Sequence, residues 1–261
     1  MTSREGIVGL ARGSGRSLDP ITRILSFAAL IIGPLVGAQW WFPPDFPRLP
    51  RQLLLALWGV GAAFVGARIV FREPWSRGAR SLGFFPARWR AVAVSFLVSV
   101  PMWSFLPLFA RSQGVSVELR PDWFEVLIGV VLVNGLAEEV IHRGFVFGGL
   151  RRERGFGRAA AISAALFAAQ HLYLLATLGW AAGGASVLLA ALLSFPLAFV
   201  FERGGSSLAG PAILHTSSNA PALVFALPET FVVGALIPHM AVVLASLYLV
   251  FAWRGLLTSR P

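Results

Sequence analysis

Eight apolar runs of about 20 residues follow one another along this chain, each long enough for an α-helix to cross the roughly 30 Å hydrocarbon core of a bilayer. Of the 261 residues, 56% are hydrophobic and 13% are charged, which is more apolar surface than a soluble core can bury. We therefore predict an all-α fold, a polytopic membrane helical bundle with about eight transmembrane helices. The predicted spans are residues 22–41, 52–71, 90–110, 123–150, 159–177, 183–201, 206–227 and 231–253.

The connections between these runs are short, and the longest stretch that is not apolar covers roughly residues 72–89. The sequence shows neither an internal repeat nor a linker long enough to separate two domains. We therefore treat residues 1–261 as one transmembrane domain whose polar motifs are confined to a core at 123–226. The run at 123–150 exceeds a perpendicular crossing, so we expect it to tilt or to extend beyond the membrane.

The distribution of basic residues, all 22 of which are arginines, predicts the orientation of the bundle. Arg48, Arg51, Arg111 and Arg120 fall on one side of the spans, Arg143 lies inside a span, and the others lie on the opposite side. Because cytoplasmic loops are rich in basic residues, both termini are predicted to be cytoplasmic. The net charge of +10 is spread over the loops of this face without a nucleic-acid-binding motif. We expect anionic lipid headgroups as its partner, and no nucleic acid.

The chain contains no cysteine. This excludes disulfides, thiolate metal sites, a cysteine nucleophile and lipidation through sulfur, so any catalysis must use oxygen and imidazole groups. The exclusive use of arginine among the basic residues is typical of GC-rich bacterial genomes. The expected location is therefore a bacterial cytoplasmic membrane, in which the protein is multi-pass.

Three short polar motifs interrupt the apolar runs: Glu138-Glu139-x-x-x-Arg143, Phe167-x-x-x-His171 and His215-x-x-x-Asn219. A charged side chain at the centre of the bilayer costs about 2.5 to 3.5 kcal/mol even on permissive scales, so such groups usually face a shared interior and carry function. Glu138, His171 and His215 each lie 12 or 13 residues from an arginine at the predicted cytoplasmic end of their helix. All three are thus about 18 to 20 Å from that end. The sequence therefore predicts one convergent site.

The two acidic residues of the first motif have different surroundings. Asn134, Glu138 and His142 are spaced i, i+4 and i+8 and form one polar stripe. Glu139 points about 100° away and can pair with Arg143 at i+4. Glu138 is the better candidate for a general base that takes a proton from water, and Glu139 with Arg143 for a buried ion pair that fixes the helix. The opposite assignment of the two glutamates stays open.

The other two motifs supply the remaining groups for hydrolysis. His171 can hold and polarise the water that Glu138 activates, while His215 and Asn219, one turn apart, can point donors at one developing negative charge. These four residues suffice for amide hydrolysis without a covalent intermediate, so our first expectation is that no cofactor is required. A metal site is the alternative, because Glu138, His171 and His215 offer the oxygen and nitrogen ligands that Zn²⁺ accepts with an open water position.

In these residues the chain resembles the CPBP family of CAAX-processing and bacteriocin-processing intramembrane proteases, also called the abortive infection family. The family pattern of EExxxR, FxxxH and HxxxN reads here E-E-V-I-H-R, F-A-A-Q-H and H-T-S-S-N, in order, within residues 123–226. The resemblance implies an intramembrane endopeptidase that cleaves a membrane-associated protein or peptide, in C-terminal processing or sorting. It also implies a water activated by Glu138 with His171 and an oxyanion held by His215 and Asn219. Metal dependence stays open.

His142 departs from that family pattern, in which an apolar or aromatic residue more usually precedes the arginine. Two interpretations are open. The imidazole tunes Glu138 from one turn away, or it is a solvated histidine near the cytoplasmic end of the site.

Two other classes of function fit the same features: a non-catalytic membrane scaffold or immunity protein, and a proton-coupled transporter that uses the buried carboxylate and histidines. A transporter is expected to show an inverted repeat or interrupted helices in matching halves, and the sequence shows no such symmetry. A scaffold is expected to have lost a motif residue, and all of them are present. Among protease substrates, a membrane-bound protein or peptide cleaved near a span is expected in preference to a prenylated one.

Overall fold

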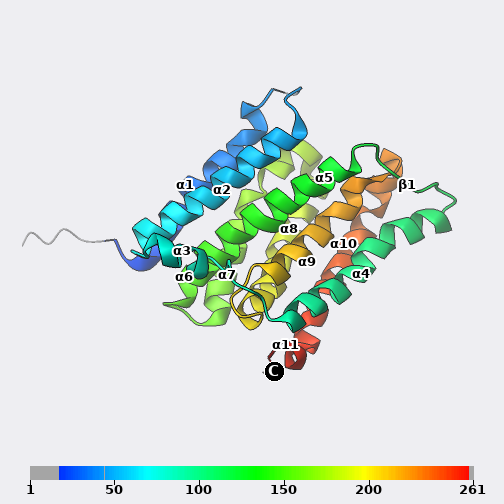
Figure 1. Ribbon diagram of the computed structural model, residues 1–261. Helices are drawn as coiled ribbons and strands as arrows, with labels where there is room; N and C mark the ends of the chain where they lie inside the picture. Colours follow the sequence, from blue (N-terminus) through cyan, green and yellow to red (C-terminus); the bar gives the residue numbers. More distant parts are fainter. Residues whose placement is uncertain (1–17, 44, 259–261) are drawn as a thin grey trace, which may run out of the picture.

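The protein, described here by a computed structural model over residues 18–43 and 45–258, consists almost entirely of helices (Figure 1). A two-residue antiparallel pair, β1 Glu118–Leu119 with β2 Phe225–Ala226, ties the connection before α5 to the end of α9. The helices are α1 Pro20–Trp41, α2 Arg48–Val70, α3 Trp75–Ser81, α4 Trp89–Ser112, α5 Trp123–Val130, η1 Val131–Glu138, η2 Val140–Phe147, α6 Gly148–Arg151, α7 Phe156–Gln170, α8 Tyr173–Arg203, α9 Ala209–Val224, α10 Glu229–Ala252 and α11 Arg254–Thr258. The predicted helical membrane bundle is confirmed.

Five helices within the described residues are long and apolar enough to cross a membrane: α1 over Pro20–Ala38, α2, α4, α8 and α10. The helices that carry the second and third polar motifs are shorter. α7 has 15 residues and α9 has 16, which at 1.5 Å per residue is about 23 and 24 Å and less than the hydrocarbon thickness. The predicted count of eight crossing helices is therefore not established.

The predicted fourth span, 123–150, is a continuous helical run from Trp123 to Arg151, but its middle is π-helical. The first π-helical stretch ends at Glu138 and the second begins at Val140, so Glu139 lies at the junction. π-helical turns are rare and occur frequently at functional sites. The helix is thus irregular where the sequence places two adjacent acids.

The predicted fifth span, 159–177, is wrong as a single helix. α7 ends at Gln170, His171 follows it with φ −93° and ψ 0°, and α8 begins at Tyr173. Within α8, Gly179 has φ 78° and ψ 171°, a conformation that favours glycine because other residues carry a Cβ. The chain turns back at this point, since Gly183 lies against the backbone of Leu174. The turn leaves the polar end of α7 inside the bundle.

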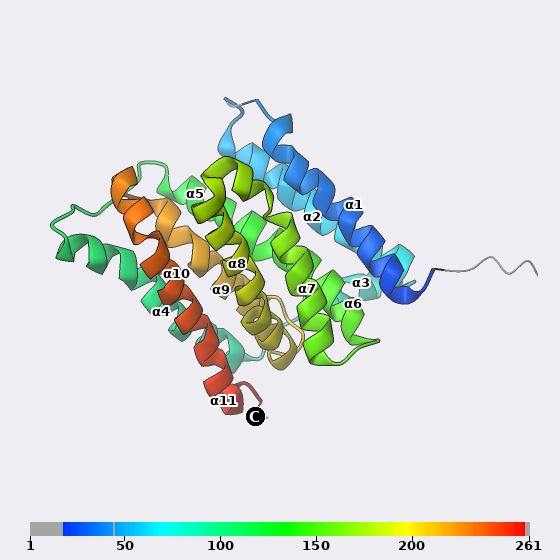
Figure 2. The same cartoon turned by 180° about the vertical axis from the view of Figure 1, so that it is seen from behind.

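The motif-bearing helices lie in the middle of the molecule, between the α1–α2 pair and the α4–α10 pair (Figures 1 and 2). η1 packs against α2 and α9, α9 packs against α4, and α7 packs against α8 and η2. The packing beside the first motif is tight, because a Cβ on Gly144 would collide with the backbone of Leu82. The bundle therefore brings all three motifs to its interior.

Ion pairs join the arginine-rich connections at one end of the bundle. These pairs are Arg151 with Glu202 and Arg152 with Glu73, the latter at 3.1 Å. At the other end, Asp122 lies 3.3 Å from Arg48 and 2.9 Å from Arg120. The arginines that the sequence divides between two sides are thus found at two ends of the fold. Arg4, Arg12, Arg16 and Arg260 lie outside the described residues.

We predict that the arginine-rich end faces the cytoplasm, and the absence of cysteine from the chain allows a direct measurement. Ser76→Cys places a thiol at that end, in α3, and Ser112→Cys places one at the opposite end of α4; both residues are exposed. A membrane-impermeant maleimide added to intact cells should label Ser112→Cys, and should label Ser76→Cys only after permeabilisation. The reverse pattern would invert the orientation.

Candidate active site

Glu139 is the centre of a buried charged network. Its side chain is fully buried, and its Oε1 lies 3.0 Å from Arg143 Nη1 and 2.6 Å from His215 Nδ1. Because a carboxylate only accepts hydrogen bonds, His215 Nδ1 carries the proton in this contact. Glu139 therefore holds both the helix-fixing arginine, as the i, i+4 spacing suggests, and the histidine of the third motif.

Arg143 is also fully buried, and neighbouring helices supply its further contacts. Its Nη2 donates to Ser194 Oγ at 3.1 Å, and its guanidinium carbon lies 4.8 Å from the ring centroid of Phe167. A buried charge is tolerated only with such partners, because leaving it unpaired costs several kcal/mol. The ion pair thus connects η1–η2 with α7, α8 and α9.

Glu138 is 7% exposed and is held by two amide donors. Gln170 Nε2 donates to its Oε1 at 3.0 Å, and Asn134 Nδ2 donates to its Oε2 at 3.4 Å. His215 Nε2 lies 3.7 Å from the same Oε2, beyond hydrogen-bond distance. The carboxylate is therefore oriented by α7 and by its own helix, η1.

His171 follows the last residue of α7, and this position fixes its tautomer. Its Nδ1 lies 2.7 Å from the carbonyl oxygen of Phe167, which can only accept a hydrogen bond, so Nδ1 carries the proton. Nε2 of the neutral ring is then an acceptor. The side chain is half-buried and borders the same cavity as Glu138.

His142 is fully buried, so the interpretation of a solvated histidine is wrong. Its Nε2 lies 2.8 Å from Gln170 Oε1, and its ring meets Phe167 edge-on with centroids 4.7 Å apart. Since the amide oxygen accepts, the bonds run from His142 through Gln170 to Glu138. The predicted stripe therefore reaches Glu138 through a residue of another helix.

Gln170 was not among the residues singled out from the sequence. Its only signal was an amide side chain next to His171 in an otherwise apolar helix. Asn219 was singled out, but its Nδ2 donates to the backbone oxygen of His215 at 3.2 Å and its side chain does not border the cavity. The structure brings Glu138 and His171 to one cavity, with His215 beside Glu138, but leaves Asn219 turned toward its own helix.

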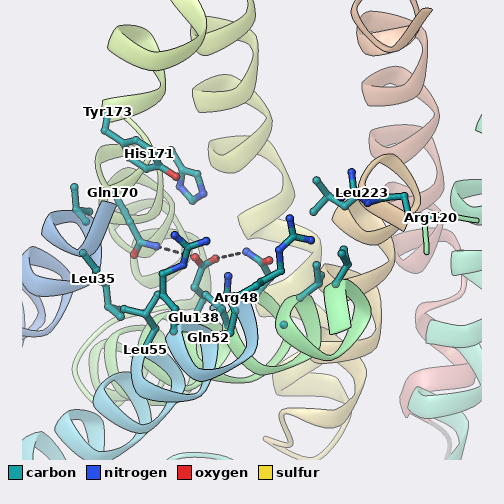
Figure 3. Close-up of a pocket in the computed structure, with 18 residues that line it drawn as sticks. Leu35, Arg48, Gln52, Leu55, Arg120, Glu138, Gln170, His171, Tyr173 and Leu223 are labelled. Atoms are coloured by element: carbon teal, nitrogen blue, oxygen red, sulfur yellow. Dashed lines mark hydrogen bonds between the residues drawn. The ribbon is translucent and has the colours of Figure 1, made fainter. Parts of the chain in front are cut away.

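A cavity of about 360 Å³ lies against Glu138, and residues from seven helical segments (α1, α2, α5, η1, α7, α8 and α9) and the connection before α5 line it. Figure 3 shows Glu138 in the middle, with Gln170 and His171 on one side and Arg120 and Leu223 on the other. The remaining lining residues are Leu35, Val36, Ala38, Arg48, Arg51, Gln52, Leu55, Val126, Gly129, Val130, Val133, Asn134 and Tyr173. These residues lie toward the end of the bundle at which α1 ends and α2 begins, opposite the arginine-rich end.

The alternative of a metal site requires Glu138, His171 and His215 to meet around one ion. Among the residues that the structure describes, no three His, Asp or Glu side chains are grouped as ligands of one ion. Glu138 and His171 border the cavity, whereas His215 is not part of its lining, although its Nε2 lies 3.7 Å from Glu138 Oε2. The donor set Glu138, His171 and His215 does not form a ligand group in this arrangement.

We predict that Glu139→Gln destabilises the protein strongly. Removing one partner of a buried ion pair costs about 3 to 5 kcal/mol, because the other charge stays buried without compensation. Adding Arg143→Met should restore part of this loss, since the double variant buries no unpaired charge. Thermal unfolding in detergent measures both effects. Glu73→Gln is the matched control, because its pair with Arg152 is partly exposed and such pairs are worth about 0 to 1 kcal/mol. Equal stability of Glu139→Gln and Glu73→Gln would contradict the network.

Comparison with known proteins finds a match in the same part of the chain. Residues 120–221 match the family described as type II CAAX prenyl endopeptidase, Rce1-like. No curated protein is similar enough to the chain to be matched. The matched segment begins before α5 and ends within α9, so it contains all three polar motifs and the helices that assemble them. Over this segment, which covers 102 of the 261 residues, the chain is similar to the CPBP family of intramembrane proteases, and the similarity supports a multi-pass membrane protein and a CAAX-type endopeptidase that hydrolyses peptide bonds.

Proposed function

We propose that the protein cleaves its substrate with a water molecule that Glu138 activates. The observation that carries this proposal is the shared cavity, which Glu138 and His171 border from different helices. Both groups accept hydrogen bonds, Glu138 through its carboxylate and His171 through Nε2. A water that donates one proton to each keeps a lone pair free to attack a carbonyl carbon.

The proposed reaction needs only protein groups and water. Glu138 takes a proton as the water oxygen attacks, the carbonyl oxygen becomes negatively charged, and Glu138 returns the proton to the departing amine nitrogen. The products are a carboxylic acid and an amine, so the atoms of one water are divided between them. No step is assigned to a metal ion, since Glu138, His171 and His215 are not grouped as ligands.

We assign the stabilisation of the oxyanion to His215 and Asn219. His215 Nδ1 donates to Glu139, so donation from Nε2 to an oxyanion requires a second proton on the ring. The carboxylate of Glu139, 2.6 Å from Nδ1, holds the ring in position for this donation. Asn219 would join as the second donor by leaving the backbone oxygen of His215 when substrate enters. Glu139 thus acts on the reaction through the histidine it holds.

We propose that substrate enters from the non-cytoplasmic side. The cavity lies toward the end of the bundle that carries few arginines, which the positive-inside rule places away from the cytoplasm. The substrate is then an exported protein or peptide that stays anchored in the membrane. The arginine-rich end is left to contact anionic lipid headgroups of the cytoplasmic leaflet.

The test is cleavage of co-expressed membrane peptides by the purified protein in detergent, followed by mass spectrometry. Glu138→Gln should lower the rate about 10² to 10⁴-fold and His171→Ala by a comparable factor, because each removes a group that handles the water. Glu118→Gln, an exposed acid in β1, is the control and should cut as the wild type does.

A chelator separates the two forms of hydrolysis in the same assay. Activity that survives chelation but is lost in both variants supports a glutamate-activated water. Activity that chelation removes and Zn²⁺ restores would replace this mechanism with a metal-dependent one. Full activity of Glu138→Gln would refute the assigned base.

We predict that Gln170 positions Glu138 for the reaction. Gln170→Leu removes the donor to Glu138 Oε1 and leaves His142 Nε2 without its acceptor, so stability should fall by about 1 to 3 kcal/mol. The double variant Gln170→Leu/His142→Phe removes both buried polar groups and should recover stability. Its kcat should nevertheless stay roughly tenfold below wild type, about 1.4 kcal/mol, with KM unchanged. Recovery of kcat together with stability would show that the role of Gln170 is only structural.

A further inference from the structure

Three arginines line the cavity, toward the end of the bundle that lies opposite the arginine-rich end. Arg48 and Arg51 lie on the first turn of α2, and Arg120 precedes α5. Asp122 is the acidic partner of Arg48, at 3.3 Å, and of Arg120, at 2.9 and 3.2 Å. Arg51 has no ion-pair partner among the residues that the structure describes. We call Arg48, Arg51 and Arg120 the arginine cluster.

The backbone holds this cluster in place. Arg120 N donates to the backbone oxygen of Val224 at 3.0 Å, which continues the pairing of β1 with β2. Arg48 and Arg51 start from a regular helix. The hydrogen bond from Arg120 lowers the pKa of Asp122 below its ordinary value, so this carboxylate stays ionised and keeps both guanidinium groups. Arg48 and Arg120 are therefore held in place before any ligand enters, and Arg51 lies on the same turn of α2 as Arg48.

Among the described residues, the three positive charges of the cluster outnumber the acidic groups that pair with it or line the cavity. Three guanidinium groups face one cavity, with Asp122 as their ion-pair partner and Glu138 as the acidic residue in the cavity lining. An arginine that only contacts lipid headgroups has no reason to line the cavity of the catalytic base. Guanidinium groups bind carboxylates with charge-assisted, often bidentate hydrogen bonds.

We propose that the arginine cluster is a subsite for a carboxylate of the peptide substrate. This inference rests on the proposed function, because it takes the peptide to be bound across Glu138. A carboxylate there would fix the register of the peptide in the cavity. The group is either the α-carboxylate at the C-terminus of the peptide or a side-chain carboxylate at the same distance from the cleaved bond.

The packing of α2 on η1 gives the distance between the cleaved bond and the bound carboxylate. Gly59 lies beside Ala137, the residue before Glu138, and Arg51 lies eight residues earlier on α2. Eight residues of helix correspond to about 12 Å along its axis. An extended peptide advances about 3.3 Å per residue, and an arginine side chain reaches inward, so about two to four residues separate the cleaved bond from the carboxylate.

The test measures binding without cleavage, on full-length Glu138→Gln in nanodiscs of phosphatidylcholine. The probes are fluorescent, N-palmitoylated peptides whose last four residues are a random mixture of uncharged amino acids, made as the free acid or as the C-terminal amide. A third probe is the amide with glutamate at one of these four positions. Fluorescence anisotropy gives Kd for each, with empty nanodiscs subtracted.

The free acid or the glutamate probe should bind roughly tenfold tighter than the plain amide, as expected for one charge-assisted contact. Which of the two does so identifies the source of the carboxylate. Adding Arg51→Gln should remove the preference, and Arg51→Lys should keep part of it. Arg111→Gln is the matched control, since Arg111 lies at the same end of the bundle and outside the cavity lining.

Equal Kd values for all probes, no measurable binding of any probe, or a preference that survives Arg51→Gln would overturn the subsite. A repeat with phosphatidylglycerol in the nanodiscs tests a lipid phosphate as the occupant. If phosphatidylglycerol abolishes the preference, and if binding of phosphatidylglycerol to the protein depends on Arg51, the cluster is a lipid site and the peptide assignment fails. The binding assay needs no cleavage, so it can succeed when the cleavage assay fails. A preference for the carboxylate probes, combined with no hydrolysis by the wild type, would refute the proposed function and leave the subsite intact.

Discussion

The contact of Glu139 with both Arg143 and His215 is the interaction on which the rest of the site depends. Three ionisable groups inside an apolar bundle are tolerated only if each satisfies another, because an unpaired charge there costs several kcal/mol. Glu139 Oε1 serves Arg143 at 3.0 Å and His215 at 2.6 Å, so one oxygen links two helical segments that are far apart in sequence. Ser194 from α8 and Phe167 from α7 make further contacts with the arginine. Glu139 therefore both holds these segments together and positions the histidine of the site.

Sequence reasoning located the bundle and the convergence of the motifs because both follow from simple periodicities. Apolar runs report helices of a given length, and i, i+4 spacing reports which side chains share a helix face. The pair of Glu139 with Arg143 is of this kind. His215 as the second partner of Glu139 is not, because the contact depends on how α9 packs against η1, which spacing along one helix does not encode.

Hydropathy and residue spacing did not predict where helices end or change geometry. Hydropathy continues smoothly through 159–177, yet α7 ends at Gln170 and the chain turns back near Gly179. Because the helix ends there, two neighbouring polar residues have different roles. His171 faces the cavity with a fixed tautomer, and Gln170 bridges His142 to Glu138. The π-helical stretches around Glu139 were equally invisible, since residue types alone do not distinguish them from α-helix.

The arginines show how one residue type gives two kinds of information. Counted along the sequence, Arg48, Arg51 and Arg120 are merely the minority that orients the bundle, and the positive-inside rule needs nothing further from them. In the fold, α2, α5 and the β1–β2 pair bring the three to the wall of the cavity that contains Glu138. A protein that needed few positive charges at this end could have omitted them at little cost. Their placement around one cavity is better explained by an anionic group that enters it than by topology, and the unpaired Arg51, with no ion partner in the described part of the chain, marks where that group would bind.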